Sequence, residues 1–219
     1  AGAIDLLRQL MTSMTLTQHR FRTMGSFGHV IVAGGPPGLV EHAQAMLGTL
    51  EQRWSRFIET SDVSRINAGA GTPVMVAAET LTLVGRMVQA WALTGGRFDP
   101  TVGVRRIGYE RPFAEGLDRL GTIEPVPGDG CAEVGVDWET GSVMIPANVQ
   151  IDPGGLGKGL AADLVAESLL HAGADGALVN VGGDMKVVGT GPEDGGWRVD
   201  VAEETVARGV LGSVLLPGG

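Results

Sequence analysis

The sequence predicts an α+β fold built from mixed layers of helices and strands. Two stretches of the first half carry apolar residues at helical spacing, whereas the second half contains short apolar runs separated by glycine and proline turns. Between residues 142 and 170 the periodicity changes from that of a strand to that of a helix, across a glycine-rich turn. Helices and hairpin-like strands in separate stretches are typical of layered α+β or α/β folds.

In the first half we expect a helical lead, one buried strand and two amphipathic helices. The lead helix is expected near residues 4–10, and the apolar run at residues 29–33 is typical of a buried strand. The next helix is expected over residues 39–54, and the following one over residues 79–93, where Gly95-Gly96 stops it. The residues expected to face the core are Leu39, Ala43, Met46, Leu47, Leu50 and Trp54 in one helix and Leu83, Val84, Met87, Val88 and Trp91 in the other.

In the second half we expect an irregular surface segment, then strands, and a helix between two of the strands. Residues 111–130 are rich in proline, glycine and charge, which is typical of an irregular surface segment. A helix is expected over residues 160–170. Strands are expected around residues 131–137, 142–151 (interrupted by a Pro146-Ala147-Asn148 turn), 177–181 and 197–201.

The bulk composition excludes several classes of protein. The chain has 219 residues, 43% of them hydrophobic and 19% charged, and its formal net charge is −9. No basic stripe offsets that charge, so we expect no nucleic-acid partner. No apolar run reaches the ~18 residues of a membrane helix, so no transmembrane segment is expected. Cys131 is the only cysteine, which rules out an intrachain disulfide. The compartment is not determined, although the chain as given favours the cytoplasm.

The glycine-rich turn at residues 151–159 has the features of an anion-binding loop. It places four glycines between an extended segment and the start of a helix, where backbone N–H groups can approach a phosphate closely. Lys158 adds a positive charge at the same point. Gly159 stands where a P-loop needs Ser or Thr, and the G-x-G-x-G spacing is not that of a Rossmann motif. Tight packing is the alternative explanation, and such turns more often serve it.

Three further segments combine turn residues with polar side chains. Phe98-Asp99-Pro100-Thr101-Val102-Gly103 follows the second helix, and residues 178–184 form an apolar strand that ends in Gly-Gly-Asp. Residues 54–67 include the polar run Ser61-Asp62-Val63-Ser64-Arg65-Ile66-Asn67. Each of these could contact a ligand, but helix caps and Asx turns explain most such clusters.

Taken in order, these motifs resemble the FAD:protein FMN transferase (ApbE-type) family. The resemblance spans about residue 24 to the C-terminus. Five ordered motifs carry it, together with the tryptophan-led strand Trp197-Arg198-Val199. The motifs are Met24-Gly25-Ser26, Ser61-Asp62-x-Ser64-Arg65-x-Asn67, Phe98-Asp99-Pro100-Thr101-Val102-Gly103, Asp152-x-Gly154-Gly155-x-Gly157-Lys158-Gly159 with Ala161-Ala162-Asp163, and Asn180-Val181-Gly182-Gly183-Asp184.

The resemblance implies an ApbE-like (T-fold-like) flavin transferase domain over residues 24–219, preceded by an N-terminal lead segment over residues 1–23. It implies an Mg²⁺-dependent enzyme that splits FAD at its pyrophosphate, moves FMN onto a threonine hydroxyl of a target flavoprotein and releases AMP. The main-chain carbonyl of Gly155 is the implied Mg²⁺ contact, and Phe57 is expected to supply a ring for an aromatic system of FAD. The FAD contacts implied position by position are Met24, Phe57, Arg97, Phe98, Asp99 and Lys158.

The family pattern continues beyond the last residues of this chain. Members carry a His-x-x-Asp-Pro-x-Thr-Gly segment and a later Ala-Asp-Ala-x-x-Thr segment, which bring a proposed base and further Mg²⁺ ligands, and neither has an equivalent here. We therefore expect the FAD-binding portion of a C-terminally truncated pattern, and no catalytic residue is assigned. Two alternatives stay open, an FAD pyrophosphatase that gives FMN and AMP, and a non-catalytic FAD-binding module.

Overall fold

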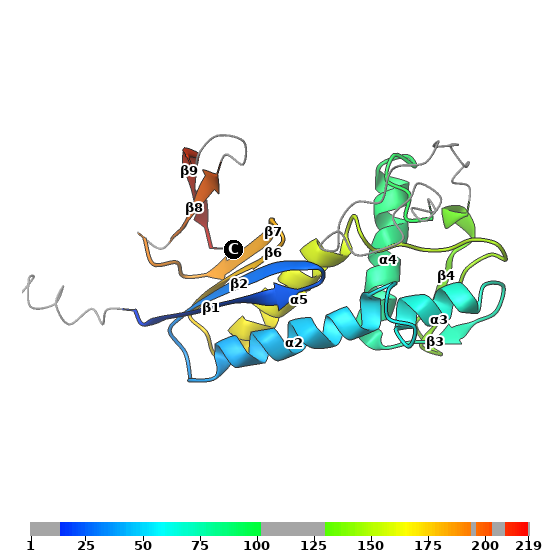
Figure 1. Cartoon of the computed structure of the whole chain (residues 1–219), viewed down its shortest axis with the longest axis horizontal. Coiled ribbons are helices and arrows are strands. Elements are labelled where there is room, and N and C mark those ends of the chain that lie inside the picture. Colours follow the sequence, from blue (N-terminus) through cyan, green and yellow to red (C-terminus); the bar gives the residue numbers. More distant parts are fainter. Residues whose placement is uncertain (1–13, 102–129, 194–195, 203–208, 219) are drawn as a thin grey trace, which may run out of the picture.

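The structure, a computed structural model, describes residues 14–101, 130–193, 196–202 and 209–218 (Figure 1). The expected helix at residues 4–10 and most of the expected irregular surface segment at residues 111–130 lie outside the described residues. The fold is a mixture of helices and antiparallel sheets, so the predicted α+β class is confirmed.

The largest sheet has four antiparallel strands in the order β1-β2-β6-β7. It consists of two hairpins, because β1 pairs with β2, β6 pairs with β7, and β2 joins them by pairing with β6. Gly28 lies opposite Val181, so the turns of both hairpins lie at the same end of the sheet. The strands are β1 (Leu16–Thr23), β2 (Ser26–Ala33), β6 (Gly176–Val181) and β7 (Asp184–Gly189).

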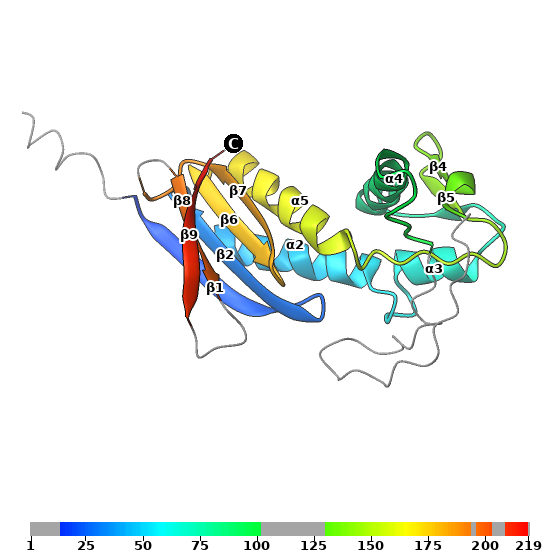
Figure 2. The ribbon, with the colours of Figure 1, turned by 90° about the horizontal axis from the view of Figure 1, so that it is seen from above.

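The two long helices α2 (Leu39–Trp54) and α5 (Gly157–His171) cover one face of this sheet (Figures 1 and 2). Their apolar faces and the inward-facing valines of the strands form the main core. On the other face stands the hairpin of β8 (Gly196–Ala202) and β9 (Val210–Pro217). It places the buried Trp197 against Leu178 and Ala33 in a second, smaller cluster.

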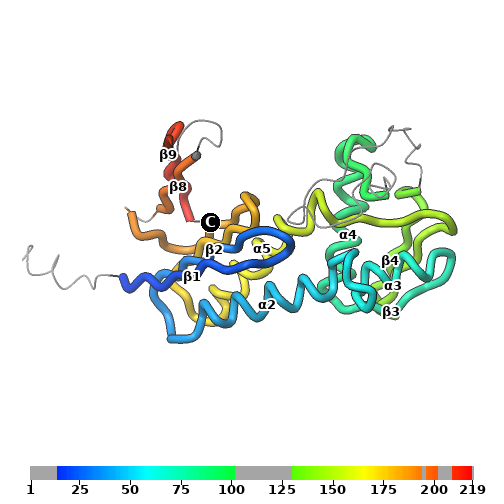
Figure 3. Tube along the Cα trace, viewed as in Figure 1, coloured from blue at the N-terminus to red at the C-terminus, as the bar shows by residue number. Residues whose placement is uncertain are grey.

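A smaller part of the fold lies beyond the end of α2, which runs from the sheet toward it (Figure 3). A short 3-10 helix covers Cys131–Glu133. Packing between α4 and the small sheet encloses Val143, Val84 and Met87 in the main core. The elements are α3 (Asp62–Ala68), α4 (Ala78–Leu93) and a three-stranded sheet of β3 (Val74–Met75), β5 (Ser142–Met144) and β4 (Gly135–Asp137).

Most of the expected elements are present, and two expectations were wrong. The strand expected over residues 142–151 ends at Met144. The next residues form a turn, in which Pro146 O accepts a hydrogen bond from Val149 N at 3.1 Å, and Ile151 then bonds to the Asn67 side chain and not to a neighbouring strand. The expected strand near residue 131 begins as a 3-10 helix, closed by bonds from Glu133 N to Gly130 O and from Val134 N to Cys131 O.

Residues 16–23 of the expected N-terminal lead form β1 and pair with β2 along their whole length. The boundary between the lead and a domain over residues 24–219 stays a prediction. Among the residues that the structure describes, no helix is both long and apolar enough to cross a membrane.

Candidate functional site

The glycine-rich turn forms the entry to α5, as its composition predicts. Asp152 Oδ1 accepts a hydrogen bond from Gly154 N at 2.7 Å, and Pro153 O accepts bonds from Leu156 N and Gly157 N at 3.0 and 2.7 Å. Helix α5 has no side-chain N-cap and no acidic residue in its first turn. The positive end of the helix dipole is therefore not neutralised by its own first turn, and the amides there can bind an anion.

Lys158 extends from this helix end toward the turns of both sheet hairpins. A methyl group placed on Gly182 would lie 3.3 Å from Lys158 Nζ and 2.7 Å from Ser26 Oγ. The ammonium group therefore lies where the β1–β2 and β6–β7 turns meet the first turn of α5. A lysine at the positive end of a helix is unfavourable by itself, and a bound anion would offset this cost.

The two hairpin turns have backbone conformations that suit a tight two-residue connection. Met24 and Gly25 have φ values of 49° and 67°, and Gly182 and Gly183 have 62° and 98°. Positive φ at both central residues is the requirement of a type I′ turn. Asn180 Oδ1 also accepts a hydrogen bond from Gly183 N at 2.9 Å, which closes the second turn. Met24 therefore lies at the end of the sheet where Lys158 Nζ is found.

The segment after α4 packs directly onto the glycine-rich turn. A methyl group on Gly155 would come within 3.0 Å of Phe98 Cε2, so the ring lies on this glycine. Asp152 N donates a hydrogen bond to Pro100 O at 2.9 Å, and Thr94 Oγ1 accepts one from Phe98 N at 3.0 Å. The structure thus brings Phe98 and Gly155 together, as both were expected to belong to one site.

Asp99 and Arg97 lie next to this contact. Asp99 Oδ1 accepts hydrogen bonds from Thr101 N at 2.8 Å and from Thr101 Oγ1 at 2.6 Å, so one carboxylate oxygen is occupied by its own turn. Burial, together with the Asp99 charge, raises the pKa of the Cys131 thiol to about 11. The Arg97 side chain is exposed.

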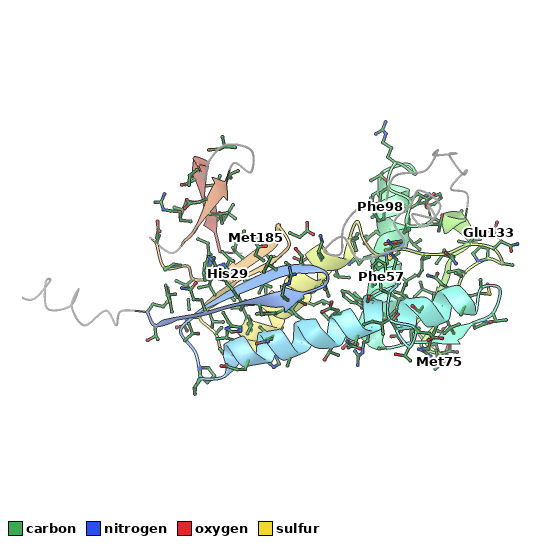
Figure 4. The ribbon with its side chains drawn as sticks, in the orientation of Figure 1. His29, Phe57, Met75, Phe98, Glu133 and Met185 are labelled. Carbon is green, nitrogen blue, oxygen red and sulfur yellow. The ribbon has the colours of Figure 1, made fainter. Side chains whose placement is uncertain are left out.

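Phe57 is an exposed aromatic residue, with 42% of its surface accessible. The guanidinium of Arg56 lies 4.5 Å from its ring centroid, within the range of a cation–π contact. In Figure 4, Phe57 and Phe98 both lie near α4, in the smaller part of the fold.

The polar run at residues 61–67 has a structural role in the fold. Ser61 caps α3 by accepting a hydrogen bond from Ser64 N at 3.0 Å. Asn67 binds the backbone of Ile151 twice, donating to its O at 3.0 Å and accepting from its N at 2.8 Å. The two hydrogen bonds of Asn67 therefore hold Ile151, the first residue of the glycine-rich turn, against α3.

Asp62 is the buried acid of this run, and both of its carboxylate oxygens accept hydrogen bonds. Its Oδ2 accepts from Thr80 Oγ1 at 2.7 Å and from Ala77 N at 3.1 Å, and Arg65 Nη2 lies 2.6 Å from Oδ1. Burial by itself would raise the pKa of this carboxyl, but these hydrogen bonds and the Arg65 charge outweigh it and lower the pKa.

A cleft of about 540 Å³ separates α4 from α5 and reaches the glycine-rich turn. Among the described residues, its walls carry the carboxylates of Asp163, Glu167 and Asp184 and the guanidinium of Arg86. Its other lining residues are Thr82, Gln89, Ala90, Leu93, Gly155, Leu156, Gly159, Leu160 and Leu164.

The expected Mg²⁺ contact, the Gly155 carbonyl, does not make a metal site by itself. Mg²⁺ requires about six oxygen ligands in near-octahedral geometry. Over the described ranges, no group of three or more His, Cys, Asp or Glu side chains is placed to hold a metal ion. The described residues therefore do not fit a complete magnesium site.

Sequence reasoning missed one residue of this region, Arg56. Its Nε lies 3.0 Å from Asp152 Oδ2, although the two residues are far apart in the chain. The position of Asp152 before the glycines was noticed, but nothing near Arg56 in the sequence indicates its partner.

Comparisons with known proteins identify what this arrangement resembles. The FAD:protein FMN transferase of Vibrio cholerae is 26% identical over 180 residues, which cover 79% of this chain and 53% of that protein. The enzyme of the same name from Haemophilus influenzae is 25% identical over 181 residues, which cover 75% of this chain and 50% of that protein. The chain thus spans about half the length of these two curated relatives.

Solved structures show the same fold. The apo form of Pseudomonas stutzeri flavinyl transferase ApbE superposes with a TM-score of 0.74 at 26% identity, covering 94% of this chain and 67% of that one. The ApbE protein from Thermotoga maritima gives a TM-score of 0.77 at 25% identity, with coverages of 94% and 69%. Residues 24–218 match the model of the ApbE family, so this chain belongs to that family.

Proposed function

We propose that this protein transfers FMN from FAD to a target flavoprotein and releases AMP. The observation that carries the proposal is the uncapped start of α5, with Lys158 between two hairpin turns, in a chain of the ApbE family. A pyrophosphate is the anion that this arrangement suits, because it can receive both the helix amides and the ammonium group. The relatives named FAD:protein FMN transferase support the same substrate.

The reaction joins the acceptor oxygen to the phosphorus of the FMN half of FAD, and the hydroxyl proton leaves to solvent. The bond from that phosphorus to the bridging oxygen breaks, and AMP leaves with the electron pair. In our proposal the amides of residues 154–159 and the Lys158 ammonium bind the pyrophosphate and balance the charge that grows on the leaving phosphate. Met24, Arg97, Phe98 and Asp99 hold the FAD beside this loop, and Phe57 packs against one of its ring systems.

Two finer points belong to the proposal. The acceptor is a threonine hydroxyl, and the reaction depends on Mg²⁺, for which the Gly155 carbonyl oxygen would be one ligand. A divalent cation shared with a pyrophosphate stabilises the charge of phosphoryl transfer. The other ligands of that ion would not come from a preformed cluster in the described part of the chain.

The test is to incubate the protein with FAD, Mg²⁺ and a flavoprotein that offers an acceptor threonine, and to analyse the products by chromatography and intact mass. AMP together with an FMN-labelled target supports the transferase. Free FMN with AMP and an unlabelled target would replace it with an FAD pyrophosphatase. FAD binding without turnover would replace it with a non-catalytic flavin-binding module.

A further inference from the structure

Asp152 connects the glycine-rich turn to the segment that follows α4. Its Oδ1 accepts the hydrogen bond from Gly154 N at 2.7 Å, and its own N–H donates to Pro100 O at 2.9 Å. The position of this one residue therefore determines where the expected pyrophosphate loop lies relative to Phe98 and Asp99.

The second carboxylate oxygen of Asp152 has an unusual environment. Oδ2 is buried and has no partner in hydrogen-bond geometry among the described residues, yet it lies 3.0 Å from Arg56 Nε. Both side chains are mostly buried, with 14% and 16% of their surfaces exposed. A buried carboxylate is costly without a nearby counter-charge, and Arg56 supplies that charge at 3.0 Å.

The same guanidinium also contacts Phe57. Its carbon lies 4.5 Å from the ring centroid, while its Nε faces Asp152. A guanidinium is planar and rigid, so it can meet a carboxylate with its edge and an aromatic ring with its face at once. The contact fixes Phe57, an exposed ring, relative to the glycine-rich turn.

We propose that Arg56 is a positioning residue that holds the two halves of the FAD site at a fixed separation. One half is the loop of residues 154–159, which Arg56 reaches through Asp152, and the other is the ring of Phe57. The inference rests on the proposed function, since it assumes that FAD spans both. A ligand that bridges two independently moving parts must order them when it binds, and a preformed link lowers that cost.

A second long-range ion pair close by provides a control. Arg53, near the end of α2, pairs with Glu79 on α4 and lies outside the glycine-rich turn and the Phe57 contact. The side chains of this pair are more exposed than those of Arg56 and Asp152, at 35% and 39%, and substitution of Arg53 removes a long-range pair without touching either half of the site.

The experiment measures the dissociation constant for FAD by flavin fluorescence, well below each variant's melting temperature, which is recorded in parallel. Arg56→Ala and Asp152→Asn should each weaken FAD binding by at least about 10-fold, and the double variant should be no weaker than the worse single one. Arg53→Ala should bind FAD as the unmodified protein does. Arg56→Lys keeps a charge for Asp152 but loses the planar stack, so it should recover melting temperature and not FAD affinity.

The outcomes distinguish a failure of the positioning role of Arg56 from a failure of the proposed function. Normal FAD affinity in Arg56→Ala, or in Arg56→Lys if the alanine variant does not fold, would overturn the positioning role while leaving the proposed function in place. Equal losses in Arg53→Ala would also overturn it, because the effect would then be general to α2. If the unmodified protein does not bind FAD, the proposed function and this inference both fail.

Discussion

Replacing Asn67 by alanine should destabilise the fold and weaken FAD binding together. Asn67 lies on α3, but both hydrogen bonds of its amide go to the backbone of Ile151, which is 2% exposed. The Asn67 side chain thus binds the backbone N–H and C=O of Ile151, which a neighbouring strand would bind in a sheet. Its removal leaves one N–H and one C=O of Ile151 without a protein partner.

The expected magnitude follows from those two groups. An unsatisfied buried donor or acceptor costs about 1–3 kcal/mol, and partial access of water to the half-buried amide site reduces the upper limit, so we expect a loss of about 2–4 kcal/mol. For a domain of this length each kcal/mol lowers Tm by about 2–4 °C, which predicts a decrease of roughly 4–16 °C.

Thermal unfolding followed by circular dichroism measures this decrease, and flavin fluorescence measures FAD affinity at a temperature where the variant is folded. Thr49→Ala is the control, because it removes only an exposed hydrogen bond to Ala45 O within α2. A Tm within 2 °C of the unmodified protein, or normal FAD affinity despite a large decrease, would show that Asn67 does not hold the loop.

Three other substitutions and one labelling experiment give independent tests. Lys158→Ala should weaken FAD binding by about 1.5–3 kcal/mol, the scale of a hydrogen bond to a charged group, and an unchanged titration curve would remove Lys158 from the site. Asp99→Asn should lower FAD affinity with little change in Tm, because an amide oxygen can still accept the bonds from Thr101; early melting with normal binding would contradict this. Because the pKa of Asp62 is lowered in the fold, its stabilising effect is complete above its ordinary value of 3.8 and is lost as pH falls through the folded-state pKa. Asp62→Asn should therefore flatten the acid side of the stability profile, and an identical slope would refute the assignment. With its pKa raised to about 11, the Cys131 thiol should react with iodoacetamide at pH 8 far more slowly than free cysteine, and a comparable rate would contradict its burial.

Elements with a clear apolar period could be predicted from the sequence. Helix α2 begins and ends where its apolar face predicts, with Leu39, Leu47 and Trp54 in the core. Strand β1 gave no such signal, because it lies at the edge of the sheet and most of its side chains are exposed. Helix α3 is short and mostly polar, so its apolar period is too weak to predict a helix. The Ser61 cap and contacts with the rest of the fold stabilise it.

The part of the candidate site that is contiguous in the chain could be predicted as a local structure. The glycines, Lys158 and the start of α5 follow one another, so their composition predicted the turn into a helix, while anion binding by this turn stays a prediction. The links of Arg56 to Asp152 and of Asn67 to Ile151 join positions that are distant in sequence. These pairs come together only because α3 and the end of α2 pack against the loop. The spacing of apolar residues in the sequence does not predict that packing.

A crystal structure of the protein with FAD tests the central claim most directly. We expect the pyrophosphate to lie against the first turn of α5, within hydrogen-bond distance of Lys158 Nζ and of backbone amides in residues 154–159. A ring system of FAD should pack on Phe57. A pyrophosphate bound elsewhere, for example in the cleft between α4 and α5 and away from Lys158, would contradict it.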